Sequence, residues 1–132
     1  MAAGRRGQRL APIADRIARV CGSPAAGMVN NNAAAVFLTL TVHADGREVV
    51  VSRGQLIAIG GSFRLPDVMS SAGSTLIEVG CTNRTHLRDF AGAISEQTAA
   101  ILVAHRSNYR VVGFTAEPST HELAELAHER GL

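Results

Sequence analysis

The chain has 132 residues, of which 46% are hydrophobic and 18% charged, and its formal net charge is +2. This composition predicts one soluble globular domain with a sizeable core, and the small net charge gives no strong case for nucleic-acid binding. All 13 basic residues are arginine, which leaves no side-chain amine for Schiff-base chemistry.

The cysteines, histidines and apolar runs argue against a disulfide-rich, metal-binding, secreted or membrane-spanning protein. Cys21 and Cys81 are too few and too far apart for a disulfide framework, and the five histidines show no metal-ligand spacing near them. We therefore predict no metal site. No signal peptide or spanning segment is evident, because Thr39, Thr41 and His43 interrupt the longest apolar run. This pattern predicts a cytoplasmic protein without a membrane partner.

The sequence pattern of the first part of the chain, up to the run "REVVVS", predicts two helices and two strands. Gln8 to Cys21 carries apolar residues at helical spacing and predicts an amphipathic helix. A short strand is expected at Gly27 to Asn30. Asn32 to His43 is apolar all round, which predicts a second helix buried on more than one side. The run "REVVVS" then predicts a strand covered on both faces.

The rest of the chain alternates between helix and strand. After a glycine-bearing loop, "RGQLIAIGGSF", helices are expected at Leu65 to Ala72, His86 to Ser95 and Thr120 to Arg130. The last helix opens with the capping-box pattern "STHE" and closes at Gly131. Strands are expected at "STLIEV" and "AAILVAH". Alternation with short connections predicts an α/β fold, a mostly parallel open sheet with flanking helices.

Polar loops follow all four predicted strands. They read "NNN", "SRG", "GCTNRT" and "HRSNY" in chain order. Ligands of open parallel sheets bind beyond the carboxyl ends of the strands. We therefore expect all four loops to converge on one edge of the sheet.

The asparagine triplet stands where a helix begins. The unpaired N–H groups of a helix start carry positive dipole character and suit a phosphate. The alternative is a capped helix whose other asparagines bind water. The chain lacks both the Walker lysine and the G-x-G-x-x-G pattern, so an ordinary nucleotide-binding fold is poorly supported.

Four motifs in order resemble bacterial selenocysteine synthase, L-seryl-tRNA(Sec) selenium transferase. They are "VNNNAAAV", "VVVSRGQLIAIGGSFRLPDVM", "EVGCTNRTHLRDF" and "HRSNYRVVGFT". The resemblance implies the large domain of a fold-type I enzyme that uses pyridoxal 5′-phosphate (PLP). It also implies that seryl-tRNA(Sec) and selenophosphate are the substrates and that the enzyme is a homo-oligomer.

The resemblance also implies site residues. The PLP phosphate would be held at the helix start by Asn30, Asn31, Asn32 and Ala33. Ser52 and Arg53 would contact the cofactor ring, and Asn108 would bind its phenolic oxygen.

Three further arginines, Arg64, Arg84 and Arg110, are candidates for contacts with substrate anions or tRNA phosphates. Their alternative role is structural, in ion pairs or at the surface.

The chain departs from the family pattern at several positions. Gln55 and Ala58 replace the two carboxylates of the family pattern "SRGELVEIGG". Cys81 replaces the first threonine of "GTTNRT", and Arg106 replaces the threonine of "HTSNY". Two alternatives therefore stay open. One is a paralogous PLP-dependent lyase acting on an amino-sugar acid, and the other is a non-catalytic module that binds a phosphorylated ligand.

The resemblance implies parts that these 132 residues do not hold. These are an N-terminal tRNA-binding region, a small C-terminal domain, the aspartate beside the pyridine nitrogen and the lysine that binds the cofactor covalently. We therefore expect residues 1–132 to be part of a PLP-binding large domain, without a catalytic residue of its own.

Overall fold

The computed structural model describes residues 11–61 and 63–132. The chain divides into two units, Met1–Ala35 and Val36–Leu132. In the first unit, helix α1 (Ala11–Cys21) confirms the predicted amphipathic helix over its described residues. Gly22, with a φ of 63°, ends the helix, and the Ser23 N–H donates to the Ala18 carbonyl at 2.9 Å. The residues Gln8 to Leu10 of that prediction lie outside the described part.

The short strand predicted at Gly27 to Asn30 is wrong. These residues are exposed and belong to neither of the two sheets in the described part of the chain. A β-branched or apolar run forms a strand only where another strand completes its hydrogen bonds, and local sequence does not reveal that partner.

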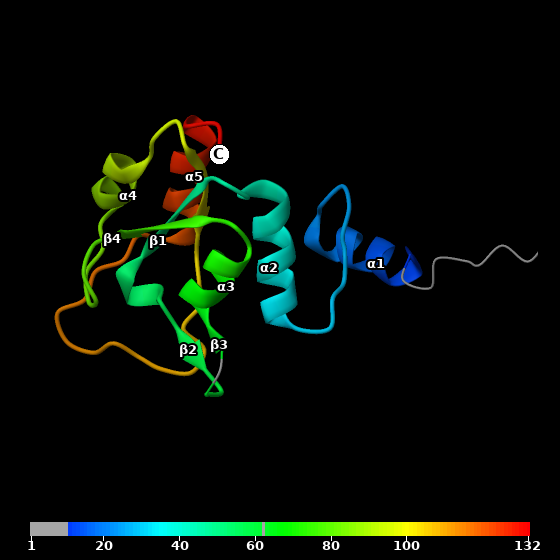
Figure 1. Ribbon diagram of the computed structural model, residues 1–132, viewed down its shortest axis with the longest axis horizontal. Helices are drawn as coiled ribbons and strands as arrows, with labels where there is room; N and C mark the ends of the chain where they lie inside the picture. Colours follow the sequence, from blue (N-terminus) through cyan, green and yellow to red (C-terminus); the bar gives the residue numbers. More distant parts are fainter. Residues whose placement is uncertain (1–10, 62) are drawn as a thin grey trace, which may run out of the picture. The chain divides into compact units, whose positions relative to one another are not determined.

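Three parallel strands form the sheet of the second unit (Figure 1). Their order is β4 (Thr75–Val79), β1 (Glu48–Ser52), β5 (Thr98–Leu102), so the first strand in sequence is central. Ser52 pairs in register with Val79, and Val51 with Leu102. The carboxyl ends of all three strands therefore meet at one edge, as the predicted fold class requires.

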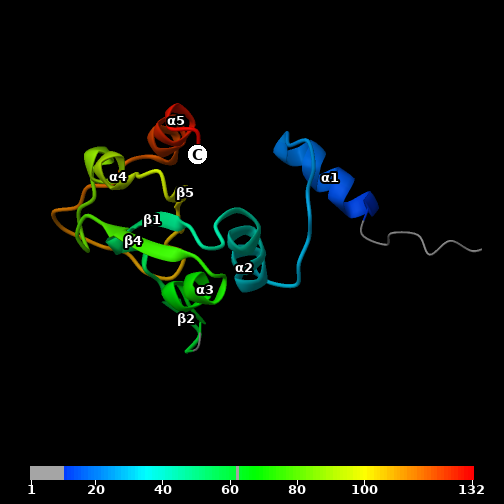
Figure 2. The same cartoon turned by 45° about the horizontal axis from the view of Figure 1, so that its top comes forward.

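Helices cover the sheet on both faces, and the central strand shows why (Figure 2). Val49 and Val51 pack in one buried cluster with residues of α2 (Asn32–His43) and α3 (Leu65–Ser71). Val50 points to the opposite face and packs with residues of α4 (Leu87–Ala93) and α5 (Thr120–Glu129). All three valines are 0% exposed, which confirms a strand covered on both sides.

The loop predicted over "RGQLIAIGGSF" contains regular structure. A 3-10 turn, η1 (Arg53–Gln55), follows β1, and β2 (Ala58–Ile59) pairs antiparallel with β3 (Phe63–Arg64). Gly60 and Gly61 adopt φ angles of 63° and 79°, which glycine accepts without strain and which reverse the chain here. A two-residue strand is too short to leave a periodic pattern in the sequence.

Helix α2 has the predicted bounds, but the prediction that it is buried on more than one side is wrong. Leu40 is its buried residue, whereas Phe37, Leu38 and Val42 are 44%, 53% and 66% exposed. Within the second unit, the buried cluster around Leu40 packs against one side of this helix. No helix among the described residues is long and apolar enough to cross a membrane.

Candidate functional site

Three of the four polar loops converge at the carboxyl edge of the sheet, as predicted. The Oγ atom of Ser52, at the end of β1, lies 2.7 Å from Thr85 Oγ1 in the loop after β4. Both side chains are buried, and Ser52 Oγ also accepts from the Gly54 N–H at 3.2 Å. Ser52 therefore fixes its own turn to the neighbouring loop.

Gly54 is enclosed by the other two loops. The Tyr109 hydroxyl, from the segment after β5, donates to the Gly54 carbonyl oxygen at 2.5 Å. On another side, a Cβ atom added to Gly54 would lie only 2.7 Å from the backbone oxygen of Thr82. Glycine is required here because any side chain would displace the loop after β4.

The segment after β5 is also attached to the loop after β4. Asn83 Nδ2 donates to the Phe114 carbonyl at 2.6 Å, and the Thr85 N–H donates to the Ala116 carbonyl at 2.9 Å. The Ala116 N–H returns a bond of 3.1 Å to the Asn83 carbonyl. The Arg84 guanidinium lies 6.0 Å from the Phe114 ring centroid. These contacts hold residues 114–116 against the sheet edge.

Gln55, Arg106 and Glu117 form a polar network between the ends of β1 and β5. Gln55 is 4% exposed, and its Oε1 accepts from the Ala104 N–H at 2.9 Å. Its Nε2 donates to one carboxylate oxygen of Glu117, and Arg106 Nη2 donates to the other. A buried amide thus connects the end of β5 to a carboxylate that precedes α5.

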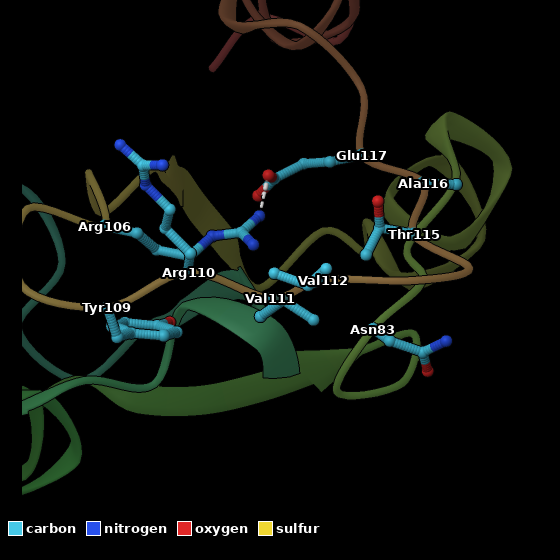
Figure 3. A pocket seen from close by; sticks show the side chains of 9 residues that line it. All are labelled: Asn83, Arg106, Tyr109, Arg110, Val111, Val112, Thr115, Ala116 and Glu117. Carbon is cyan, nitrogen blue, oxygen red and sulfur yellow. Dashed lines mark hydrogen bonds and ion pairs between the residues drawn. The ribbon is translucent and has the colours of Figure 1, made fainter.

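Two cavities share the Arg106–Glu117 pair as part of their walls. One, of about 330 Å³, also includes Asn83, Tyr109, Arg110 and Thr115 (Figure 3). The other, of about 520 Å³, extends past Gln55 and His105 to the start of α5. Both lie at the sheet edge where ligands of this architecture bind.

The predicted site residues of the second unit do not gather at one place, and their surroundings differ from residue to residue. Arg53 is exposed and pairs with Glu78, with Nε to Oε2 at 3.0 Å. Asn108 and Arg64 are exposed, and neither lines the two cavities. Arg84 contacts Phe114 as described above. Of the three candidate arginines, Arg110 lines a cavity.

The asparagine triplet belongs to the first unit. Asn31 Oδ1 accepts from the Ala34 N–H at 2.8 Å, which makes Asn31 the N-cap of α2. Asn30 and Asn32 are exposed, and Ala33 is half-buried. The capping role proposed as the alternative is therefore present for one of the three asparagines. Phosphate binding, and convergence of this loop with the other three, stay predictions.

Sequence reasoning missed four residues that organise the sheet edge. Thr85 and Tyr109 lie in loops that were expected to converge, and Glu117 lies further along the segment after β5, but no local pattern marks them as contacts. Gln55 was noted only as a lost carboxylate. A polar residue directly after a buried strand was the available signal, because such a residue needs a hydrogen-bond partner.

Among the described residues, no group of three histidine, cysteine or acidic side chains is placed to hold a metal ion. Cys21 and Cys81 are free and exposed.

A parallel sheet with helices on both faces and polar loops at its carboxyl edge defines the class of protein as α/β. The described fold is similar to the solved structure of D-glucosaminate-6-phosphate ammonia-lyase, with a TM-score of 0.80 at 18% identity. That likeness covers 99% of this chain and 39% of the lyase chain, and it confirms the predicted fold class, an α/β fold with a parallel sheet and flanking helices.

The chain belongs to the L-seryl-tRNA selenium transferase family, whose sequence model matches residues 1–132. It is 56% identical over 132 residues to the L-seryl-tRNA(Sec) selenium transferase of Solidesulfovibrio magneticus. It is 57% identical over 129 residues to that of Nitratidesulfovibrio vulgaris. These matches cover 100% and 98% of this chain but 28% of each relative, so the chain spans about a quarter of their length. The resemblance drawn from the four motifs is confirmed.

Proposed function

We propose that residues 1–132 are part of the PLP-binding large domain of an L-seryl-tRNA(Sec) selenium transferase. The observation that carries the proposal is the family match over every residue of the chain. The intact enzyme would convert seryl-tRNA(Sec) to selenocysteyl-tRNA(Sec) with selenophosphate, in the cytoplasm and as a homo-oligomer. The lyase alternative has less support, because its 18% identity reflects a shared fold alone.

The start of α2 has donors that suit the phosphate of PLP. The N–H groups of Asn32 and Ala33 have no hydrogen-bond partner within residues 11–61 and 63–132, whereas Asn31 has already capped Ala34. The helix has 12 residues, and the exposed amides of Asn30 and Asn32 add two donor groups. An anion at this position gains both the helix dipole and the free N–H groups.

Residues near the sheet edge would hold the rest of the cofactor. In this proposal the planar guanidinium of Arg53 stacks on the ring and Ser52 fixes the turn that carries it. The Arg53–Glu78 pair is exposed and therefore weak, about 0–1 kcal/mol, so it does not hold Arg53 away from a ligand. Asn108 donates to the phenolic oxygen. When bound, PLP supplies an electron sink for the substrate carbon.

Arg64, Arg84 and Arg110 are proposed to meet substrate anions or tRNA phosphates. All three are exposed, and charge-assisted bonds from arginine to phosphate are bidentate and strong. Of the three, Arg110 has the most support because it lines a cavity.

The experiment is a PLP titration of the 132-residue chain and of its Asn31→Asp variant, both in a Val42→Glu background that limits aggregation. Aspartate caps a helix about as well as asparagine, so the free energy of unfolding should not change. Its negative charge would repel the phosphate and remove one donor, and PLP affinity should fall at least tenfold, since such a bond is worth about 1.5–3 kcal/mol. Inorganic phosphate should compete with PLP.

The control is Gln97→Ala, which removes an exposed amide from the residue before β5. It should leave PLP binding unchanged. Equal PLP affinity in the wild type and in Asn31→Asp would end the phosphate assignment and leave the triplet as a helix cap. A bound phosphorylated ligand with no preference for PLP would favour the non-catalytic module.

A further inference from the structure

We propose that Arg106, at the wall between the two cavities, is the central residue of a binding site for a small oxyanion of the phosphate class. The site takes Arg106 and Arg110 as cations and uses Glu117 to orient Arg106. This proposal does not rest on cofactor binding by Asn30, Asn31 and Asn32.

Arg106 retains most of its hydrogen-bonding capacity. A guanidinium carries five N–H donors, and the bond to Glu117 is made through Nη2. The remaining donors have no acceptor within residues 11–61 and 63–132. The side chain is 23% exposed, and it lines both cavities. Because guanidinium donors form a planar fork that matches an oxyanion, the free edge of Arg106 can bind one without releasing Glu117.

Glu117 is held in place independently of Arg106. Its second oxygen accepts from Gln55, whose amide is almost completely buried and fixed by the Ala104 N–H. A carboxylate at position 55 would instead repel Glu117, so the amide at this position permits the network. Glu117 therefore serves as a fixed acceptor that aims the Arg106 guanidinium along the cavity wall.

The charge and size of the smaller cavity fit a small anion. Two arginines and one glutamate contribute the charged groups of its wall, and Thr115 adds a hydroxyl. Figure 3 shows Arg106 extending to Glu117 and Arg110 pointing away from that pair. A volume of about 330 Å³ lies at the lower end of the range for small-molecule sites, roughly 300–1,000 Å³. A concave wall that contains a carboxylate favours a compact oxyanion over a nucleic-acid backbone.

The test is a titration of inorganic phosphate, monitored by NMR and calorimetry, into the 132-residue chain that carries Asn31→Asp together with Val42→Glu, which removes an exposed apolar side chain of α2 to limit aggregation. The Asn31→Asp background removes the other proposed phosphate site. We expect saturable binding with shifts at the Arg106 side chain and at the Gly113–Ala116 backbone. Arg106→Thr should lower the affinity at least tenfold, and Arg106→Lys should lower it less. The matched control is Arg88→Thr, which removes an exposed arginine from α4 and should leave phosphate affinity unchanged.

Glu117→Gln leaves one acceptor oxygen at this position, which cannot accept from both Gln55 and Arg106, so the Arg106 guanidinium is no longer held in its orientation. We expect this variant to lower phosphate affinity several-fold, with the melting temperature recorded for every variant. Equal losses in Arg106→Thr and Arg88→Thr would overturn the proposal, as would unchanged binding in a natively folded Glu117→Gln chain. Phosphate binding that Asn31→Asp abolishes and Arg106→Thr leaves intact would also overturn it, while supporting the proposed function. A short single-stranded RNA that binds more tightly than phosphate, and depends on Arg106, would overturn the choice of a small ligand.

Discussion

Ser52 Oγ and Thr85 Oγ1 lie 2.7 Å apart at the carboxyl edge of the sheet, and their side chains are 1% and 2% exposed. One belongs to the end of β1 and the other to the loop after β4. The hydroxyl pair is therefore a buried connection between two of the loops that form the candidate site.

Ser52→Ala should destabilise the protein by about 1–3 kcal/mol, because Thr85 Oγ1 would lose a buried partner. Thr85→Val should have a similar cost. The double variant should cost less than the sum of the two, since neither hydroxyl is then left alone, with a coupling of about 0.5–3 kcal/mol. Urea unfolding of the four proteins measures this cycle. Simple additivity would show that the two hydroxyls do not depend on each other.

Gly54 and Gly92 offer a matched pair of substitutions. At Gly54 an added Cβ would lie 2.7 Å from the Thr82 backbone oxygen, whereas at Gly92, in α4, nothing lies within 4 Å. Gly92→Ala should stabilise the protein by about 0.5–1 kcal/mol through better helix propensity. Gly54→Ala should destabilise it and change the NMR shifts of residues 81–85. The same stability change at both positions would mean that Gly54 is not constrained by the neighbouring loop.

The parts of the fold that local pattern controls were predictable. The β-branched run at Val49 to Val51 identified a doubly covered strand, and the Ser119–Glu122 spacing identified the capping box that opens α5. The alternation of helices and strands was then enough to predict a parallel sheet whose polar loops lie at one edge.

The parts that depend on distant contacts were not predictable. Gln55, Arg106 and Glu117 come from three segments, and their network exists because the sheet brings the ends of β1 and β5 together. The strand predicted at Gly27 to Asn30 failed for the related reason that a strand needs a partner. A propensity describes one segment and carries no information about which other segment will pair with it.

The exposed face of α2 should control the solution behaviour of the isolated chain. Phe37, Leu38 and Val42 are 44–66% exposed on this helix, and exposed apolar patches promote association. We expect the isolated chain to aggregate or to populate a loosely packed state. Val42→Glu should reduce light scattering at a given concentration and change the free energy of unfolding by no more than about 0.5 kcal/mol.

The control for that experiment lies on the same helix. Leu40 is 4% exposed and packs in the core with Val49, so Leu40→Gln should destabilise the fold and increase scattering. If Val42→Glu left aggregation unchanged, association would have to occur through another surface.

The stability of α5 should depend on pH through the carboxylate of Glu122. The pKa of Glu122 is below its ordinary value, chiefly because the Ser119 hydroxyl donates to its carboxylate at 2.7 Å. The Ser119 N–H, also at 2.7 Å, and the charge of His121 lower the pKa further. A pKa that is lower in the folded state than in the unfolded one means that the carboxylate stabilises folding above the unfolded-state pKa. That contribution is lost as the pH falls through the folded-state pKa.

Glu122→Gln tests this dependence because glutamine still accepts the capping hydrogen bond but does not titrate in this range. Urea unfolding from neutral pH down through the carboxylate range, around pH 4.3 and below, should show a smaller loss of stability for this variant than for the wild type. Glu129→Gln removes an exposed carboxylate from the same helix and has no capping contact, so it should keep the wild-type pH dependence. The same loss in all three proteins would show that the Ser119–Glu122 capping box does not couple the stability of α5 to pH.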